Sequence, residues 1–116
     1  MTPQRVPEPR LGVVDARLEA VDRVLRSRAT DSAVADVTVL LTHVTSDLAD
    51  MAAAADTRTA AKLTTVRSDV SGHLLAAASL ESAGAPASAA VAMLRRATSA
   101  ARAGLEATYG GPYRSS

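Results

Sequence analysis

The chain has 116 residues, a formal net charge of +1, and a hydrophobic fraction of 47%. That is the length of one domain. The sequence holds no cysteine, which excludes a disulfide framework, a thiolate nucleophile and cysteine metal ligands. The nearly balanced charge excludes a strong overall attraction to nucleic acid or to anionic membranes.

The composition favours helices over sheets. Alanine accounts for 26 residues, valine and leucine supply most of the larger apolar side chains, and Phe, Trp and Ile are absent. Alanine is the best helix former and has no bulky side chain to lose freedom in a helix. A sheet favours β-branched and aromatic side chains. We therefore expect an all-α fold.

Residues 1–10 form a proline-rich N-terminal arm that contains Pro3, Pro7 and Pro9. The arm lacks the apolar run of a secretory signal peptide. The longest weakly charged stretch, 73–94, is interrupted by an acid, a glycine and a proline, so it does not resemble a membrane span. We expect a cytoplasmic protein that does not bind membranes.

Four segments follow the arm, each with apolar residues spaced three and four positions apart, as on one face of a helix. The first stripe is Leu11, Val14, Leu18, Val21 and Leu25; the second is Val34, Val37, Leu41, Val44, Leu48 and Met51; the third is Leu63, Val66, Val70, His73, Ala77 and Leu80; the fourth is Val91, Leu94, Thr98, Ala101 and Leu105. Each segment can therefore turn one face toward a shared core.

Residues typical of helix ends separate the four segments. Residues 29–31 offer an N-cap for the second helix, and residues 56–57 offer one for the third. Gly84 is typical of the position after a helix end, and Pro86 of the first turn of the next helix. The Gly-Gly-Pro run at 110–112 ends the fourth helix. Connections this short favour antiparallel neighbours.

Two alternatives concern the second segment. Residues 37–45 are rich in β-branched side chains and resemble a strand, but no second strand is available to pair with them. The junction from Met51 to Leu63 lacks Gly and Pro, so the second and third helices could join in one long helical hairpin, although a phase shift between their stripes favours a break. We predict an antiparallel four-helix bundle over residues 11–108 and a Tyr/Gly C-terminal tail over 109–116.

Charge differs from one segment to the next. Residues 31–56 hold five aspartates and no Lys or Arg, whereas residues 1–30 hold six arginines and residues 83–116 hold four. Two interpretations stay open: ion pairs between adjacent helices, or an acidic face that binds a basic partner. The residues assigned to a charged interface are Asp36, Asp47, Asp50, Arg95, Arg96 and Arg102.

No residue pattern predicts catalysis. The two histidines, His43 and His73, stand far apart in the sequence and form no short-spaced metal-binding pair. His73 stands in an apolar stripe, which is typical of a core histidine, whereas His43 lies one position off its stripe. The sequence contains no Gly-x-Ser-x-Gly turn and no Walker motif. We predict a protein that is not an enzyme and has no catalytic, cofactor or metal site.

Apolar residues outside the stripes indicate an interface, because a monomeric bundle leaves such residues exposed. Those beside or opposite their stripes are Val13, Val24, Val39, Leu40, Leu75 and Met93. The two tyrosines lie in the tail, and tyrosine anchors interfaces well. The residues assigned to partner binding are Val39, Leu40, Met93, Tyr109 and Tyr113.

Small residues recur at intervals of four in two segments: Ser68, Gly72 and Ala76 in the third, and Ala100 and Gly104 in the fourth. A glycine inside a helix is less favourable than alanine by about 1 kcal/mol. Close approach of two backbones would compensate for that loss. An alanine-rich chain also produces such spacings by chance, so both interpretations stay open.

The sequence thus predicts a non-enzymatic helical interaction or assembly subunit that associates with itself, as a homo-oligomer, or with another protein. One alternative is a small regulatory protein that binds nucleic acid through Arg95, Arg96 and Arg102. Another is a helical bundle that holds a small ligand or metal around His73.

Overall fold

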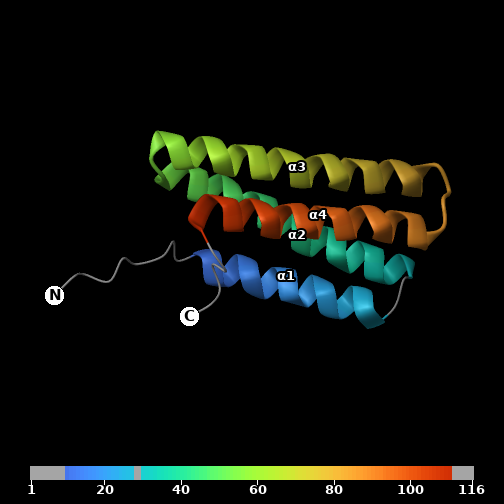
Figure 1. The fold of residues 1–116 in the computed structure, drawn as a ribbon. Coiled ribbons are helices and arrows are strands. Elements are labelled where there is room, and N and C mark those ends of the chain that lie inside the picture. The colour runs from blue at the N-terminus through green and yellow to red at the C-terminus, as the bar shows by residue number, and fades with distance from the viewer. Residues whose placement is uncertain (1–9, 28–29, 111–116) are drawn as a thin grey trace.

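The computed structural model describes residues 10–27 and 30–110, which form four helices (Figure 1). Their bounds are α1 Arg10–Ser27, α2 Asp31–Ala54, α3 Thr57–Ser82 and α4 Ala87–Tyr109. Each helix runs opposite to the one before it (Figure 1), which confirms the antiparallel four-helix bundle. Most of the proline-rich arm, residues 1–9, and residues 111–116 of the tail lie outside the described residues.

The second and third helices are separate, so the long helical hairpin is wrong. Ala55 and Asp56 both have extended backbone between the helices, with ψ of 166° and 167°. Residues 37–45 lie inside α2. The helix that we predicted for this segment is therefore confirmed, and the alternative of a strand is wrong. The hydroxyls of Thr42 and Thr45 each donate a hydrogen bond to a carbonyl of the preceding turn, at 2.7 Å. These bonds satisfy the polar atoms of the β-branched side chains within the helix.

Side chains cap the N-termini of α2 and α3. The Thr30 hydroxyl accepts a hydrogen bond from the Ala33 N–H at 3.1 Å. The Asp56 carboxylate accepts one from the Thr59 N–H at 2.7 Å. Each bond satisfies a backbone donor that has no partner within its own helix. Both predicted caps are therefore confirmed, with Asp56 rather than Thr57 in the second.

Glycines end α3 and α4. Gly84 has φ of +79°, and the next N–H, of Ala85, donates to the Leu80 carbonyl at 2.9 Å. This is the left-handed helix end for which glycine is suited. Pro86 directly precedes α4 as its N-cap, one residue before the predicted first turn. Gly110 has φ of +80° and ends α4, as predicted.

The Asp56 cap makes the stability of the bundle sensitive to acid. Hydrogen bonds from Thr59 hold the pKa of the Asp56 carboxyl below its ordinary value of 3.8. Because the folded-state pKa is depressed, the stabilisation is complete above the unfolded-state pKa and is lost as the pH falls through the folded-state value. We expect Asp56→Asn, which keeps a capping oxygen but does not titrate there, to lose less stability than the wild type between pH 7 and pH 2.5, as measured by urea denaturation. An identical loss in both proteins would contradict this assignment.

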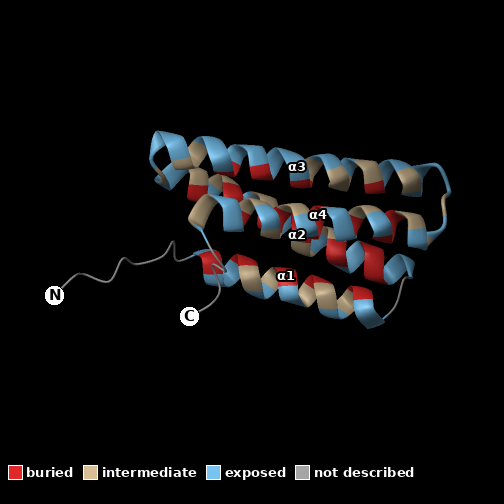
Figure 2. Ribbon diagram, viewed as in Figure 1, coloured by how far each residue is buried: buried red, intermediate tan, exposed pale blue. Residues whose placement is uncertain are grey.

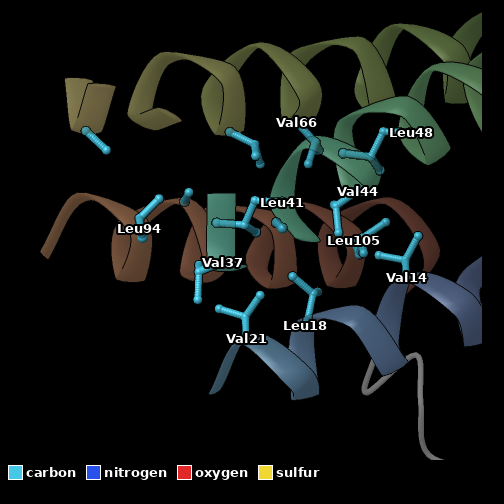
Figure 3. Close-up of a cluster of buried hydrophobic side chains, with 14 of the residues drawn as sticks. Val14, Leu18, Val21, Val37, Leu41, Val44, Leu48, Val66, Leu94 and Leu105 are labelled. Carbon is cyan, nitrogen blue, oxygen red and sulfur yellow. The ribbon is translucent and has the colours of Figure 1, made fainter. Parts of the chain in front are cut away.

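The four apolar stripes form one core (Figures 2 and 3). Every member of the first, second and fourth stripes is buried, as predicted. In the third stripe Leu63, Val66, Val70 and Ala77 are buried, whereas His73 and Leu80 are half-buried. His73 is therefore not the fully enclosed core histidine that its place in the stripe predicts.

The helices are not equally engaged with one another. Among the described residues α3 packs most extensively on α4, and α2 contacts all three other helices. α1 packs mainly on α2, touches α4 lightly and does not contact α3. The helices α2, α3 and α4 therefore contact one another, whereas α1 packs along α2 and makes a smaller contact with α4.

Gly104 explains the close contact of α3 with α4. A Cβ atom at this position would lie 2.8 Å from Cγ1 and 3.1 Å from Cβ of Val66, and closer still to Cγ2. A Cβ at Gly72 would meet nothing within 4 Å. Close backbone approach is therefore confirmed for Gly104, whereas Gly72 serves no such contact.

Candidate interaction surface

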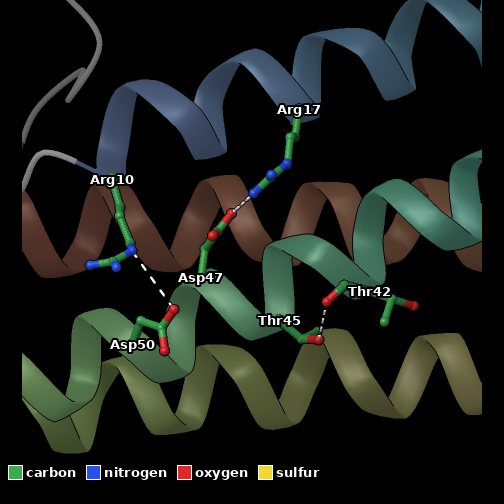
Figure 4. A network of polar contacts seen from close by, with 6 residues as sticks. All are labelled: Arg10, Arg17, Thr42, Thr45, Asp47 and Asp50. Carbon is green, nitrogen blue, oxygen red and sulfur yellow. Dashed lines mark hydrogen bonds and ion pairs between the residues drawn. The ribbon is translucent and has the colours of Figure 1, made fainter.

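Two acidic residues of α2 face basic residues of α1. Asp47 pairs with Arg17, and Arg10 Nε lies 3.8 Å from Asp50 Oδ2 (Figure 4). Pairing between adjacent helices is thus confirmed for these two predicted interface residues. Asp36 is exposed on the same helix, outside these two pairs.

Two of the three α4 arginines are engaged within the chain. Arg102 Nη2 lies 2.7 Å from Asp22 Oδ2 of α1. Arg95 Nη2 donates to the Leu25 carbonyl at 3.1 Å, which supplies a partner for one of the last carbonyls of α1. Arg96 is exposed. The hydrogen bond from Arg95 to the end of α1 depends on where α1 ends relative to α4. The sequence did not predict this contact.

The apolar residues assigned to partner binding are not equally accessible. Val39 is 56% exposed, whereas Leu40 and Met93 are half-buried and pack against the core. Tyr109 is the last residue of α4 and also packs partly against the core, so it belongs to the bundle rather than to the tail. Tyr113 lies outside the described residues.

Two further apolar residues off the stripes are exposed. Leu75 of α3 is 70% exposed, and Val13 of α1 is 45% exposed. Val24, the remaining residue of this group, is half-buried against the core. Leu75 is thus more exposed than any described residue that the sequence assigned to partner binding, and its position opposite the third stripe is the signal that marks it.

Val39 and Leu75 each lie in an uncharged stripe on the outer side of a helix, and we call these two stripes the outer stripes. The α2 stripe consists of Ser32, Ala35, Val39, Thr42 and Ser46, and the α3 stripe of Thr57, Ala61, Thr64, Ser68, Gly72, Leu75, Ser79 and Ser82, all of them exposed. Exposed charged residues flank both stripes, among them Asp36 on α2 and Arg67 and Asp69 on α3. The spacing is again three and four, but neither stripe contains a charged residue. The solvent face of a helix is usually rich in charged and polar side chains. Removing water from these two stripes therefore costs less free energy than removing it from charged side chains.

A shallow depression of about 360 Å³ lies beside Val39. It is lined by Thr38, Thr42, His43 and Ser46 as well as by Val39 itself. His43 is exposed, as its place off the second stripe predicts. The depression therefore offers a mostly apolar recess with hydroxyl groups at its edges, next to the exposed valine.

The predicted ligand alternative centred on His73, but His73 does not line this depression. It is also absent from a second open depression of about 400 Å³, which lies over Gly104 between α3 and α4. Within residues 10–27 and 30–110, no group of three His, Asp or Glu side chains is placed to hold a metal ion. Neither of these two depressions therefore supports a ligand site centred on His73.

No helix within the described ranges is long and apolar enough to cross a bilayer.

The chain matches no protein-family model, no curated protein and no solved structure. The argument for function therefore rests on the surface itself.

Proposed function

We propose that this protein is a cytoplasmic, non-enzymatic interaction subunit that associates with another protein or with itself through the outer stripes of α2 and α3. The observation that carries the proposal is the exposure of two large apolar side chains, Val39 and Leu75, each within a stripe of uncharged residues. Burial of apolar surface is the main favourable term in protein association. A partner that covers only the uncharged stripes also avoids the penalty for removing charges from water.

Val39 and Leu75 lie at similar positions along the long axis of the bundle. Val39 lies 15 residues before the end of α2 at Ala54, and Leu75 lies 18 residues after the start of α3 at Thr57. Because α2 and α3 are antiparallel neighbours, a partner that wraps around the outer sides of both helices would meet the two side chains at a similar position along the bundle. The small residues around them allow a partner helix to approach closely.

The predicted charged interface has less support as a partner site. Asp47, Asp50 and Arg102 already pair within the chain, and Arg95 caps α1. These contacts fix helix positions, which is the commoner use of charges between adjacent helices. Because Arg95 and Arg102 are engaged in this way, we do not extend the proposal to nucleic acid.

The test is native mass spectrometry of the protein isolated from its own host, followed by sedimentation of purified protein with the associated partner. We expect the wild type in an assembly heavier than the 11.9 kDa chain. The double variant Val39→Thr, Leu75→Ser should weaken that association at least about tenfold, because it removes the apolar contact.

Val13→Thr is the matched control, since it removes an exposed valine that lies on α1, outside the outer stripes. It should leave the association unchanged. All three substitutions are on the surface and should change the free energy of unfolding by less than about 0.5 kcal/mol each. A wild type that is monomeric and without companions, or a double variant that associates as tightly as the wild type, would refute the proposal.

A further inference from the structure

A depression between α1 and α4, which we call the α1–α4 recess, is lined by charged side chains. Its volume is about 280 Å³, and it lies between two helices that touch each other only lightly. The described residues that line it are Glu19, Asp22, Arg23 and Arg26 of α1 and Arg102 of α4. Three guanidinium groups and two carboxylates therefore border the same space.

One guanidinium of the recess is fixed by one of its carboxylates. Arg102 Nη2 lies 2.7 Å from Asp22 Oδ2, and both side chains are partly buried. On an isolated helix the natural partner of Asp22 would be Arg26, which stands four residues later on the same face. Because Asp22 reaches across to α4 instead, Arg26 is left without this partner.

Arg23 and Arg26 are therefore two cations that the fold does not neutralise. Neither guanidinium makes an ion pair or a hydrogen bond with another residue of the ranges 10–27 and 30–110. Both residues are exposed, and at a spacing of three they are neighbours on the surface of α1. Like charges placed side by side repel each other, and an anion between them would replace this repulsion with attraction.

We propose that the α1–α4 recess binds the phosphate dianion of a small phosphorylated molecule. Arg23 and Arg26 supply planar groups of N–H donors that match the oxygens of a phosphate, and a dianion balances their two charges. Arg102, oriented by Asp22, adds a third guanidinium at the α4 side. The volume lies just below the range of about 300–1,000 Å³ that is typical of small-molecule sites, which fits a small compound rather than a polymer.

The site is independent of the proposed function. The α1–α4 recess shares no residue with the outer stripes of α2 and α3, so failure of one proposal leaves the other intact.

The test is a titration of the ¹⁵N-labelled protein with methyl phosphate, followed by NMR at constant ionic strength and pH 7.5, where the phosphate is mostly a dianion. We expect saturable shifts of amide signals centred on residues 19–26 and on Arg102. Dimethyl phosphate, a monoanion of similar size, should bind at least about tenfold more weakly. Equal affinities for the two probes, or no saturable shift at these residues, would overturn the proposal.

The double variant Arg23→Gln, Arg26→Gln should weaken the binding of methyl phosphate at least about tenfold. Its matched control is Arg58→Gln, Arg67→Gln, which removes the same charge from two exposed arginines of α3, a helix that α1 does not contact. The control should keep the affinity of the wild type, because salt screens the attraction of distant charges. Equal losses in the two double variants would mean that only net charge attracts the probe, and would refute a defined site.

Glu19→Gln tests the recess in the opposite direction. A carboxylate that lines the recess repels a bound anion, so its removal should tighten the binding of methyl phosphate at least about twofold. Glu81→Gln makes the same change at an exposed residue near the end of α3 and should leave the affinity unchanged. Binding that is no tighter in Glu19→Gln than in Glu81→Gln would count against the recess as the binding site.

Discussion

Replacement of Gly104 by alanine should destabilise the bundle by about 1–3 kcal/mol, the range for an added methyl group in a well-packed contact. Alanine is the better helix former by about 1 kcal/mol, so the direction of the effect is opposite to that expected from helix propensity. The reason is that the new Cβ overlaps both methyl groups of Val66 and also crowds its Cβ. A side-chain rotation cannot clear all three atoms, and valine is in any case nearly restricted to one rotamer in a helix. The helices α3 and α4 must therefore move apart.

Gly72→Ala is the matched control. It lies inside α3 with nothing within 4 Å of its added Cβ, so it should stabilise the protein by about 0.5–1 kcal/mol. Both free energies of unfolding are measured by urea denaturation with circular dichroism, because the chain has no tryptophan. Adding Val66→Ala to Gly104→Ala should give a smaller loss than the sum of the two single changes. Stabilisation by Gly104→Ala alone would show that the close approach is not required.

Leu41→Ala should have the largest effect of any substitution considered, a loss of about 2–5 kcal/mol. Leu41 is fully buried on α2, which contacts all three other helices, so few neighbours can move to fill the space without disturbing another contact. An alanine-rich core has few large side chains to compensate. A domain of this size is typically stable by only about 5–15 kcal/mol.

Leu75→Ala is the control for Leu41→Ala, since it makes the same chemical change at a side chain that is 70% exposed. It should alter the free energy of unfolding by less than about 0.5 kcal/mol, while the urea m-value stays the same in both variants. Similar losses at the two positions would mean that Leu75 is covered in the folded protein, or that Leu41 is not.

The burial pattern could be predicted from spacing, and where it fails the reason is geometrical. A strict repeat of seven residues drifts by about 20° per repeat around a straight helix. Leu63, Val70 and Ala77 stay near the centre of the buried face of α3. In the other row Val66 is buried, but His73 and Leu80, each seven residues further on, have drifted to the edge and are half-buried.

The candidate surface could be predicted only in part. Val39 lies opposite its stripe and is exposed as expected. Leu40 and Met93 lie beside their stripes, and a core-facing helix buries an arc of about 100° or more, so these two are partly covered. Sequence spacing defines the faces of each helix but not which neighbour each face meets. For that reason the contact between Arg95 and the end of α1 could not be predicted.

The dependence of α1 on α4 has a consequence for the growing chain. A ribosome releases α1 first and α4 last, yet Leu105, Arg102 and Arg95 on α4 complete the site where α1 lies. During translation α1 can pack on α2 but cannot reach its final set of partners until Tyr109 at the end of α4 has emerged. Until then the side of α1 that later meets α4 stays exposed to solvent.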